Sequence, residues 1–252
     1  MKVSIVTVVY NNETTIADAI NSVLDQDYHD IEYIVVDGAS KDGTMDIIKQ
    51  YSNKISKVIS EPDKGIYDAM NKGVALATGD VVGILNSDDF YLNSTVISSI
   101  VEKMISDGVD SVYGDLVYVD PVDTKVVKRY WQSGSFRRRR FLYGWMPPHP
   151  TFFVKSEIYE KHGLFNLSLR SAADYEFMLR VLYKYKISSS YLKEIVTVMR
   201  DGGNSNASIK NRIKGNNEDV LAWKINELKP FFFTRYFKPL RKIPQFFTKK
   251  VI

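Results

Sequence analysis

Two adjacent carboxylates, Asp88 and Asp89, follow an apolar run at residues 81–85 and are candidates for holding a divalent cation. Two like charges side by side usually need a positive partner. Oxygen ligands suit a hard ion such as Mg²⁺ or Mn²⁺, which in turn neutralises a diphosphate. Asp and Asn also favour turns, because their side chains bond to the nearby backbone. The pair therefore predicts either a metal and diphosphate site or a solvated turn, and both remain open.

The first third of the chain predicts the sheet that would position this pair. Apolar runs predict strands and apolar residues at helical spacing predict helices; the strands are expected at 3–9, 33–36, 58–60 and 81–85, and the helices at 14–25, 42–51 and 66–77. This alternation is typical of a parallel sheet covered by helices on both faces. Right-handed crossovers then bring the loops at Tyr10, Asp37 and Asp88 to one edge, where α/β sheets bind ligands.

After residue 93 the pattern changes to a mixed sheet. We expect strands at 111–120, 125–131, 151–154 and 195–199, and helices at 94–106, 156–162, 173–184 and 206–227. The chain contains no Gly-x-Gly-x-x-Gly and no Gly-Lys-Ser/Thr loop. The usual dinucleotide and P-loop interpretations therefore lack support.

Composition limits the remaining classes. The 252 residues suit one large domain, or one domain with a tail, and the absence of cysteine excludes disulfides and thiolate chemistry and favours a reducing compartment. The chain contains no run of 18 apolar residues, so no membrane span is predicted. Residues 1–9 fit a first strand better than a signal peptide. We therefore expect a cytoplasmic protein.

The C-terminal segment 229–252 has a different charge from the rest of the chain. It carries seven basic residues among seven aromatic ones and no acid, and the remainder has 27 basic against 30 acidic residues. Basic and aromatic residues together suit an anionic bilayer surface, so this segment predicts a peripheral anchor on the inner face of the membrane. The alternative is that it packs on the domain or on a second subunit, as in a homodimer. The acidic body argues against nucleic-acid binding, and the run Arg137–Arg140 predicts a charged loop or a phosphate contact.

Five motifs in order resemble the family 2 glycosyltransferases of the GT-A fold, over roughly residues 1–200. The motifs are Ser4-Ile5-Val6-Thr7-Val8-Val9-Tyr10-Asn11, Val35-Val36-Asp37-Gly38-Ala39-Ser40-Lys41-Asp42-Gly43-Thr44, Asp63-Lys64-Gly65-Ile66-Tyr67-Asp68-Ala69-Met70-Asn71-Lys72-Gly73, Asn86-Ser87-Asp88-Asp89 and Ala173-Asp174-Tyr175-Glu176. Among subgroups the chain is similar to bacterial transferases that build polysaccharides and glycolipids. The resemblance implies inverting transfer of a hexose or N-acetylhexosamine from a nucleotide-diphosphate donor, by family habit a UDP-sugar, to a glycan or lipid-linked acceptor.

The resemblance also implies roles for individual residues. Asp174 matches the catalytic base, with helix capping as the alternative, and Asp89 and Asp88 match the metal site, with Asp88 also a candidate for the ribose. Asn86 stands where the family often has an acid, and Ala173 where it often has Glu. The remaining donor-side candidates are Thr7, Val9, Tyr10, Asp37, Lys64 and Asn71. His149 is a candidate near the metal, and Trp145 and Glu176 are candidates on the acceptor side.

The resemblance further implies a domain division. Residues 1–205 would form the glycosyltransferase domain, with a donor half at 1–93 and an acceptor half at 94–205, and residues 206–252 a C-terminal helical extension. Two rival functions remain. A nucleotidyltransferase shares paired acids but would carry a Gly-rich basic loop after the first strand, unlike Tyr10-Asn11-Asn12-Glu13. A non-catalytic sugar-nucleotide-binding scaffold is favoured only by Asn86 and Ala173.

Overall fold

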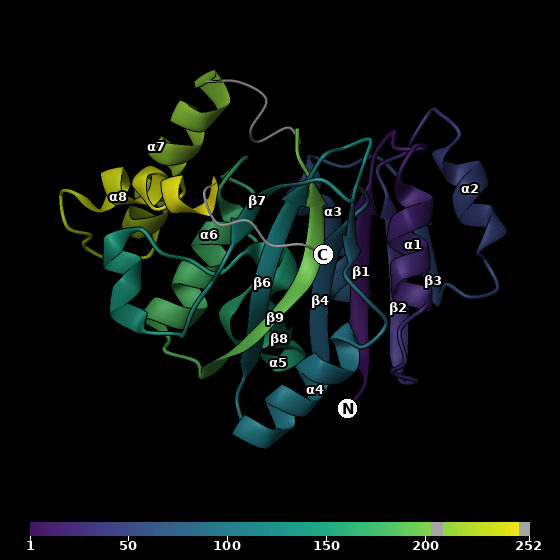
Figure 1. Cartoon of the computed structure of the whole chain (residues 1–252), viewed down its shortest axis with the longest axis horizontal. Coiled ribbons are helices and arrows are strands. Elements are labelled where there is room, and N and C mark those ends of the chain that lie inside the picture. Colours follow the sequence, from purple (N-terminus) through teal and green to yellow (C-terminus); the bar gives the residue numbers. More distant parts are fainter. Residues whose placement is uncertain (203–208, 247–252) are drawn as a thin grey trace.

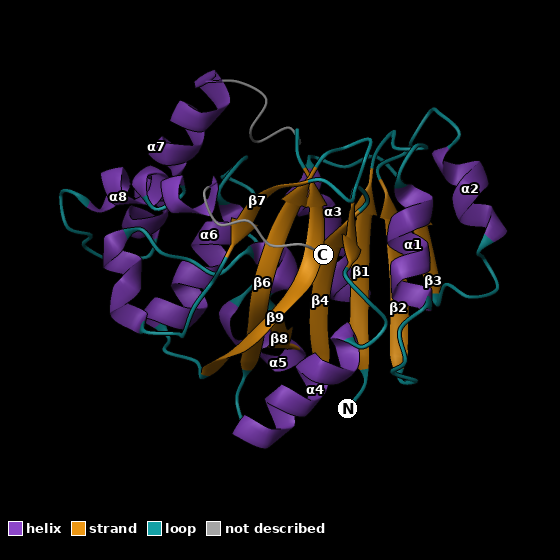
Figure 2. Cartoon of the chain, in the orientation of Figure 1, coloured by secondary structure: helices purple, strands orange, loops and turns teal. Residues whose placement is uncertain are grey.

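The computed structural model describes residues 1–202 and 209–246, with residues 209–214 as backbone only. Within these ranges the chain forms one mixed sheet with helices on both faces (Figure 1, Figure 2). The strands are β1 (Val3–Val9), β2 (Ile31–Asp37), β3 (Lys57–Ser60), β4 (Val81–Asn86), β5 (Asp89–Tyr91), β6 (Ser111–Val119), β7 (Val127–Trp131), β8 (Phe153–Lys155) and β9 (Ser189–Arg200).

The helices follow the predicted order. They are α1 (Ile16–Leu24), α2 (Thr44–Gln50), α3 (Ile66–Leu76), α4 (Val96–Asp107), α5 (Ser156–His162), α6 (Ala173–Met178), α7 (Ile209–Ile225) and α8 (Thr234–Leu240). Shorter helical turns are η1 (Arg138–Tyr143), η2 (His149–Thr151), η3 (Leu179–Lys184) and η4 (Ile243–Phe246). The predicted start of the 206–227 helix and the predicted domain boundary at residue 205 lie outside the described residues.

The sheet order is β3-β2-β1-β4-β8-β6-β9-β5, with β7 paired to β6. β1 is parallel to β2 and to β4, and β2 is parallel to β3. β8 then runs antiparallel to β4 and β6. The predicted α/β class, with a parallel first half and a mixed second half, is therefore confirmed.

Strand β1 is buried on both faces, which explains why its sequence is a continuous apolar run. Val6 and Val8 face a core that includes α3 and α6, whereas Val3, Ile5 and Val9 face a core that includes α1 and α4. This alternation follows from the two-residue period of a strand. The central strands are thus held between two helical layers, and their carboxyl ends are fixed in place.

Helix α3 approaches β1 unusually closely. A Cβ atom added to Gly73 would lie 2.2 Å from Cγ1 of Val6, well inside van der Waals contact. Glycine at this position therefore sets the distance between the helix and the sheet. That distance matters for the site, because α3 carries Tyr67 and Asn71 toward the second half of the chain.

Three local features differ from the predicted pattern. Strand β5 was not predicted, because its three residues are too short to show a period and include Asp89. Strand β9 starts at Ser189, earlier than predicted, because its polar first residues pair with β6 instead of entering an apolar core. The helix predicted at 173–184 is α-helical only to Met178 and continues as the wider turn η3.

A buried carboxylate, Glu32, ties together the amino-terminal ends of the central strands. It accepts hydrogen bonds from Ser4 Oγ at 2.6 Å, Lys57 Nζ at 2.9 Å and Thr78 N at 2.7 Å. Burial alone would raise the pKa of Glu32, but these bonds outweigh burial and lower the pKa to about 2. The folded state therefore favours the ionised form.

Glu32→Gln is expected to lower the free energy of unfolding at pH 7 by about 3 kcal/mol, because a depressed carboxylate pKa stabilises the fold only while the group is ionised. The contribution is present above the ordinary pKa of 4.5 and is lost as the pH falls toward 2. Urea unfolding at several pH values should show the variant and the wild type converging below pH 4. Glu102→Gln, on the exposed face of α4, is the matched control. Parallel pH profiles for wild type and Glu32→Gln would contradict this role.

Candidate active site

The loops after β1, β2 and β4 are joined to one another at the carboxyl edge of the sheet. Asn11 N donates to Ser40 Oγ at 2.7 Å, and Lys41 N donates to Asn11 Oδ1 at 2.8 Å. Asn12 Nδ2 donates to Ser87 Oγ at 2.9 Å, in the turn between β4 and β5. These bonds hold the three predicted loops together as one surface.

The ring of Tyr10 is exposed to solvent at this edge of the sheet. Tyr10 is 63% exposed, although its neighbours in β1, Thr7 and Val9, are buried. A Cβ on Gly38 would lie 3.2 Å from the Tyr10 ring and 2.9 Å from the carboxylate of Asp63. Glycine therefore lets the second loop approach the ring closely, and Tyr10 is free to stack on a flat ligand. Thr7 accepts a hydrogen bond from Tyr33 at 3.1 Å inside the core, away from this surface.

Asp37 ends β2 fully buried. Its Oδ2 accepts hydrogen bonds from Ser60 Oγ at 2.6 Å and from Ser40 N at 3.0 Å. The carboxylate therefore supports its own turn. Binding by Asp37 stays a prediction.

Two further donor-side candidates lie in the loop before α3 and on α3 itself. Lys64 is exposed. Asn71 instead bonds to the backbone of Phe165 in both directions, at 2.9 Å each way. Its amide thus holds the chain before α6 against α3. Lys72, the next residue of α3, is paired with Asp63 at 2.6 Å and with Glu61 at 2.9 Å.

The paired acids occupy the tight turn from β4 to β5. Asp88 is half-buried and Asp89 is fully buried. Burial, and then the negative charge of Asp88, raise the pKa of Asp89 well above its ordinary value. Asn86 Nδ2 donates to Asp89 Oδ2 at 3.0 Å. Within the described residues, Asp89 Oδ1 and Asn86 Oδ1 are buried and accept no hydrogen bond.

A cation that the sequence did not reveal lies beside this turn. Arg200, the last residue of β9, donates to the backbone oxygen of Asp88 at 2.8 Å and pairs with Asp18 on α1. Its guanidinium lies 5.1 Å from the ring centre of Phe90. The arginine lowers the pKa of both acids, against the larger effect of burial. It therefore fixes the turn and partly offsets its charge.

Asp174 lies half-buried in the first turn of α6, and the N-cap position of that helix is occupied by Ala172. Its Oδ1 accepts a hydrogen bond from the hydroxyl of Tyr67 on α3 at 2.9 Å. Burial, and then the charge of Asp174, raise the pKa of Tyr67 well above its ordinary value, so the phenol stays protonated and donates. The structure thus gives Asp174 a partner across the molecule, in place of the capping role that was the alternative.

Tyr67→Phe is expected to lower kcat about tenfold with little change in the KM for the donor, because a hydrogen bond to a charged group contributes about 1.5–3 kcal/mol. The phenyl ring keeps its contact with Phe165, whose ring centre is 5.8 Å away. Steady-state kinetics of the transfer reaction test this. An unchanged kcat would show that the bond does not orient the carboxylate.

The pKa of one buried tyrosine, Tyr118, is affected by acids of both predicted sites. Burial raises the pKa of Tyr118 on β6, and the charges of Asp89, Asp201 and Asp174 raise it further, while Arg129 opposes them. Asp89 comes from the donor half and Asp174 from the acceptor half. An acid from each predicted half therefore lies within electrostatic reach of Tyr118.

Comparison with known proteins accounts for this arrangement. The profile described as glycosyl transferase family 2 matches residues 4–162, more than half of the chain. The chain belongs to glycosyl transferase family 2. It is a glycosyltransferase by this membership and by its relatives, which sets aside the nucleotidyltransferase alternative.

Relatives and solved structures agree with the assignment. An uncharacterized glycosyltransferase of Mycobacterium tuberculosis is 34% identical over 185 residues, covering 71% of this chain and 68% of the relative. A PGL/p-HBAD biosynthesis glycosyltransferase of Mycobacterium bovis is 29% identical over 210 residues, covering 82% and 80%. S. aureus TarS 1–349, solved in complex with UDP-GlcNAc, has a TM-score of 0.72 at 20% identity, covering 90% of this chain and 65% of that chain. Mannosyltransferase PcManGT from Pyrobaculum calidifontis, solved with GDP-Man and Mn²⁺, has a TM-score of 0.67 at 17% identity, covering 94% and 72%. These structures show the shared GT-A fold.

In this family 2 glycosyltransferase, His149 lies in η2, buried against Phe165 with the ring centres 5.5 Å apart. Burial lowers its pKa, against a smaller opposite effect of Asp174, so the imidazole is neutral near pH 7. Among the described residues, no three His, Cys, Asp or Glu side chains gather to hold a metal. His149 therefore does not complete a three-residue cluster with Asp88 and Asp89.

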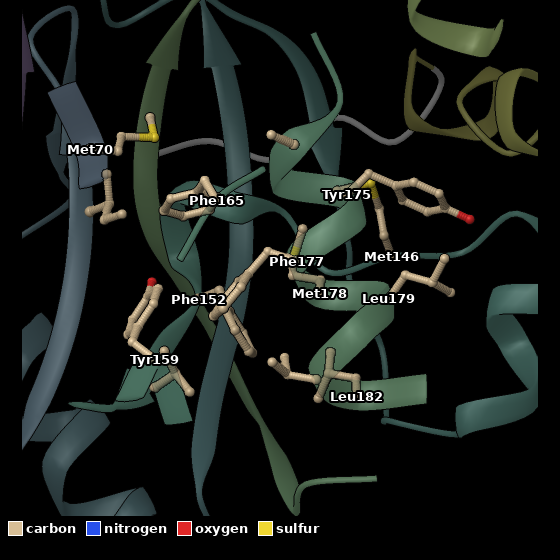
Figure 3. Close-up of a cluster of buried hydrophobic side chains, with 14 of the residues drawn as sticks. Met70, Met146, Phe152, Tyr159, Phe165, Tyr175, Phe177, Met178, Leu179 and Leu182 are labelled. Carbon is tan, nitrogen blue, oxygen red and sulfur yellow. The ribbon is translucent and has the colours of Figure 1, made fainter. Parts of the chain in front are cut away.

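Two acceptor-side predictions differ from the structure. Trp145 is buried, and its indole donates to Ser133 O at 2.8 Å, so it is a core residue with no face open for stacking on a sugar. Glu176 is buried and pairs with Arg180 at 3.0 Å, so it does not face an open groove. Figure 3 shows the apolar cluster around α6, in which Tyr175 points away from Phe165.

Proposed function

We propose that this glycosyltransferase transfers a hexose or N-acetylhexosamine from a nucleotide-diphosphate sugar, with inversion, to a hydroxyl of a glycan or lipid-linked acceptor. The proposed setting is surface polysaccharide or glycolipid synthesis on the cytoplasmic side of the membrane. The observation that carries the proposal is the hydrogen bond of 2.9 Å from Tyr67 on α3 to Asp174, which joins the predicted donor half to the predicted acceptor half in a chain that belongs to family 2. The M. bovis relative, named for PGL/p-HBAD biosynthesis, supports the glycolipid setting.

In the proposed mechanism Asp174 is the general base that accepts the proton of the acceptor hydroxyl. Tyr67 occupies Oδ1 of Asp174. The carboxylate is thereby oriented so that Oδ2 can accept the proton of the acceptor hydroxyl as its oxygen attacks the anomeric carbon. Attack from the face opposite the leaving diphosphate is a single displacement, which inverts the configuration. The hydrogen bond from Tyr67 on α3 therefore orients the carboxylate, whereas Asp174 itself accepts the proton. Such orientation speeds the reaction because the reacting groups are already held in position when the substrates are bound.

The residues of the β4–β5 turn fit a divalent cation, Mn²⁺ or Mg²⁺. The fit rests on the unpartnered oxygens of Asp89 and Asn86 and on the neighbouring carboxylate of Asp88. Mg²⁺ is commonly held by one or two carboxylates together with substrate phosphates and water. Asp88 and Asp89 would hold the ion, which when bound stabilises the charge of the departing diphosphate. The mannosyltransferase solved with Mn²⁺ supports this assignment.

The donor is proposed to be a UDP-sugar. TarS was solved with UDP-GlcNAc and the Pyrobaculum enzyme with GDP-Man, so both nucleotides belong in the test. We assign the exposed ring of Tyr10 to stack on the base, with stacking worth about 1–3 kcal/mol. Lys64 is the exposed candidate for a phosphate contact.

A donor panel tests the proposal. Purified protein with Mn²⁺ is given UDP- and GDP-sugars, and release of nucleoside diphosphate is measured with and without a glycolipid extract as acceptor. Acceptor-stimulated release from one UDP-sugar, with an inverted product by NMR, is the expected result. Pyrophosphate release would point to nucleotidyl transfer instead. Donor binding by thermal shift, which reports ligands by mass action, without turnover of any donor would point to the scaffold alternative.

A further inference from the structure

Helix α8 is fixed to the catalytic domain along one side. Thr234 Oγ1 donates to Leu142 O at 2.6 Å, and Lys238 Nζ pairs with Asp219 at 2.6 Å while lying 3.9 Å from the ring centre of Tyr175. A Cβ on Gly144 would lie 2.4 Å from Lys238 N, so the two backbones are in close contact. The described part of the tail therefore packs on the domain, which was one of the two alternatives from the sequence.

The opposite side of the same segment is apolar and exposed. Phe232, Tyr236 and Leu240 recur every fourth residue, which places them on one side of the helix and its entry. They are 88%, 52% and 54% exposed, and Ile243 in the following turn is 51% exposed. We call these four residues the outer face of α8. Docking of the helix leaves these four side chains exposed.

The charges around the outer face have one sign. Arg235 and Arg241 are exposed beside it, and residues 228–246 contain no acid. Arg241 also lies near Arg140, whose pKa falls through burial and the repulsion of Arg241. The tail thus forms a basic, apolar surface on a body whose remaining residues carry a small excess of acid.

We propose that the outer face of α8 docks the enzyme on an anionic membrane surface, with its apolar side chains in the interface and the arginines near lipid phosphates. Amphipathic segments of this composition bind through buried apolar area together with attraction to anionic lipid. A second copy of the chain fits less well, because a two-fold contact would bring the same basic patch against itself. The described part of the chain contains no helix that could span a bilayer.

The docking also orients the catalytic side of the molecule. Lys238 on α8 contacts Tyr175, the residue after Asp174, through the ring contact described above. Figure 1 shows α8 at the end of the molecule opposite α2, beyond the strands β6 and β7. A bilayer contacted by α8 therefore lies on the side of α6 and away from α2. Membrane docking stands independently of the proposed transfer reaction.

Vesicle flotation of the full chain tests the docking. Wild type is expected to float with vesicles of phosphatidylglycerol and phosphatidylcholine, weakly with phosphatidylcholine alone, and less at about 0.5 M NaCl because salt screens the arginines. Phe232→Gln with Leu240→Gln should reduce the floated fraction at least fivefold. Ile105→Gln, 61% exposed on α4, is the matched control and should float as wild type does.

Two controls keep the outcomes distinct. Thermal unfolding should be unchanged in the double variant, because both side chains are exposed, and donor hydrolysis without vesicles should be unchanged as well. Equal flotation of double variant and wild type, or no flotation of wild type, overturns the proposal. A dimer by light scattering that the double variant converts to a monomer, with no vesicle binding, would assign the outer face to a second copy. Failure of donor turnover with intact flotation would count only against the transfer reaction.

Discussion

Asp174→Asn is expected to lower kcat about a thousandfold, since a positioned general base contributes about 10²–10⁴ in rate. The amide retains the shape of the carboxylate and can still accept the hydrogen bond from Tyr67, so the fold and the donor site remain intact. Stopped assays of sugar transfer give kcat, and isothermal calorimetry with the nucleoside diphosphate and Mn²⁺ gives the donor-side affinity. The expected pattern is lost turnover with affinity changed less than twofold.

The control for Asp174→Asn is a surface acid of the same type. Asp46→Asn, on α2 and 79% exposed, removes the same charge far from the site and should leave kcat unchanged. A kcat within threefold of wild type for Asp174→Asn would remove this residue as the base. Loss of nucleotide affinity together with turnover would instead assign it to donor binding.

Asp89→Asn is expected to lower kcat/KM by a factor of about 10²–10³, the cost of removing one group that stabilises charge developing in the transition state. The substitution should also weaken metal-dependent nucleotide binding. In the metal-free protein, by contrast, Asp89→Asn is expected to leave the folded state as stable as in wild type or to make it more stable. The Asp89 carboxylate is fully buried, and burial and Asp88 raise its pKa. A raised carboxylate pKa means that ionisation penalises folding above the ordinary pKa of 3.8, so removing the charge relieves a penalty at pH 7.

Thermal unfolding in EDTA and in Mn²⁺ with nucleotide separates the two effects of Asp89→Asn. In EDTA the melting temperature of the variant should equal or exceed that of wild type. In Mn²⁺ with nucleotide the melting temperature of wild type should rise, whereas that of the variant should not. Asp46→Asn, the exposed acid on α2, provides the comparison. A variant that melts lower in EDTA but keeps the metal response would mean that Asp89 serves the fold and leaves the metal to Asp88.

Much of the fold could be predicted because, in its first half, the apolar pattern of each segment matches the strand or helix that the segment forms. Strands such as β1 are buried on both faces and therefore read as apolar runs, and α1 and α3 show clear helical spacing. Their order in the chain then determined a parallel sheet with the loops at Tyr10, Asp37 and Asp88 on one edge. The mixed second half was predicted in kind, although β5 was missed.

The partners within the site could not be predicted, because they come from distant positions. Tyr67 lies 107 residues from Asp174, and Arg200 lies 112 residues from Asp88. A tyrosine in a helix and an arginine ending a strand carry no local sign of such pairing. Trp145 and Glu176 show the opposite error, since their residue types suggest an open site whereas neighbours such as Ser133 and Arg180 hold them inside.

Helix α3 belongs by sequence to the donor half, yet it carries the bonds that hold the acceptor half. Tyr67 bonds to Asp174 and Asn71 to the backbone of Phe165, and Gly73 fixes the helix against β1. Chimeras between this enzyme and its relatives should therefore fail when the junction is placed near residue 93, because the acceptor half would then meet a foreign α3. Acceptor preference would be exchanged more safely by transferring residues 66–76 together with residues 94–200.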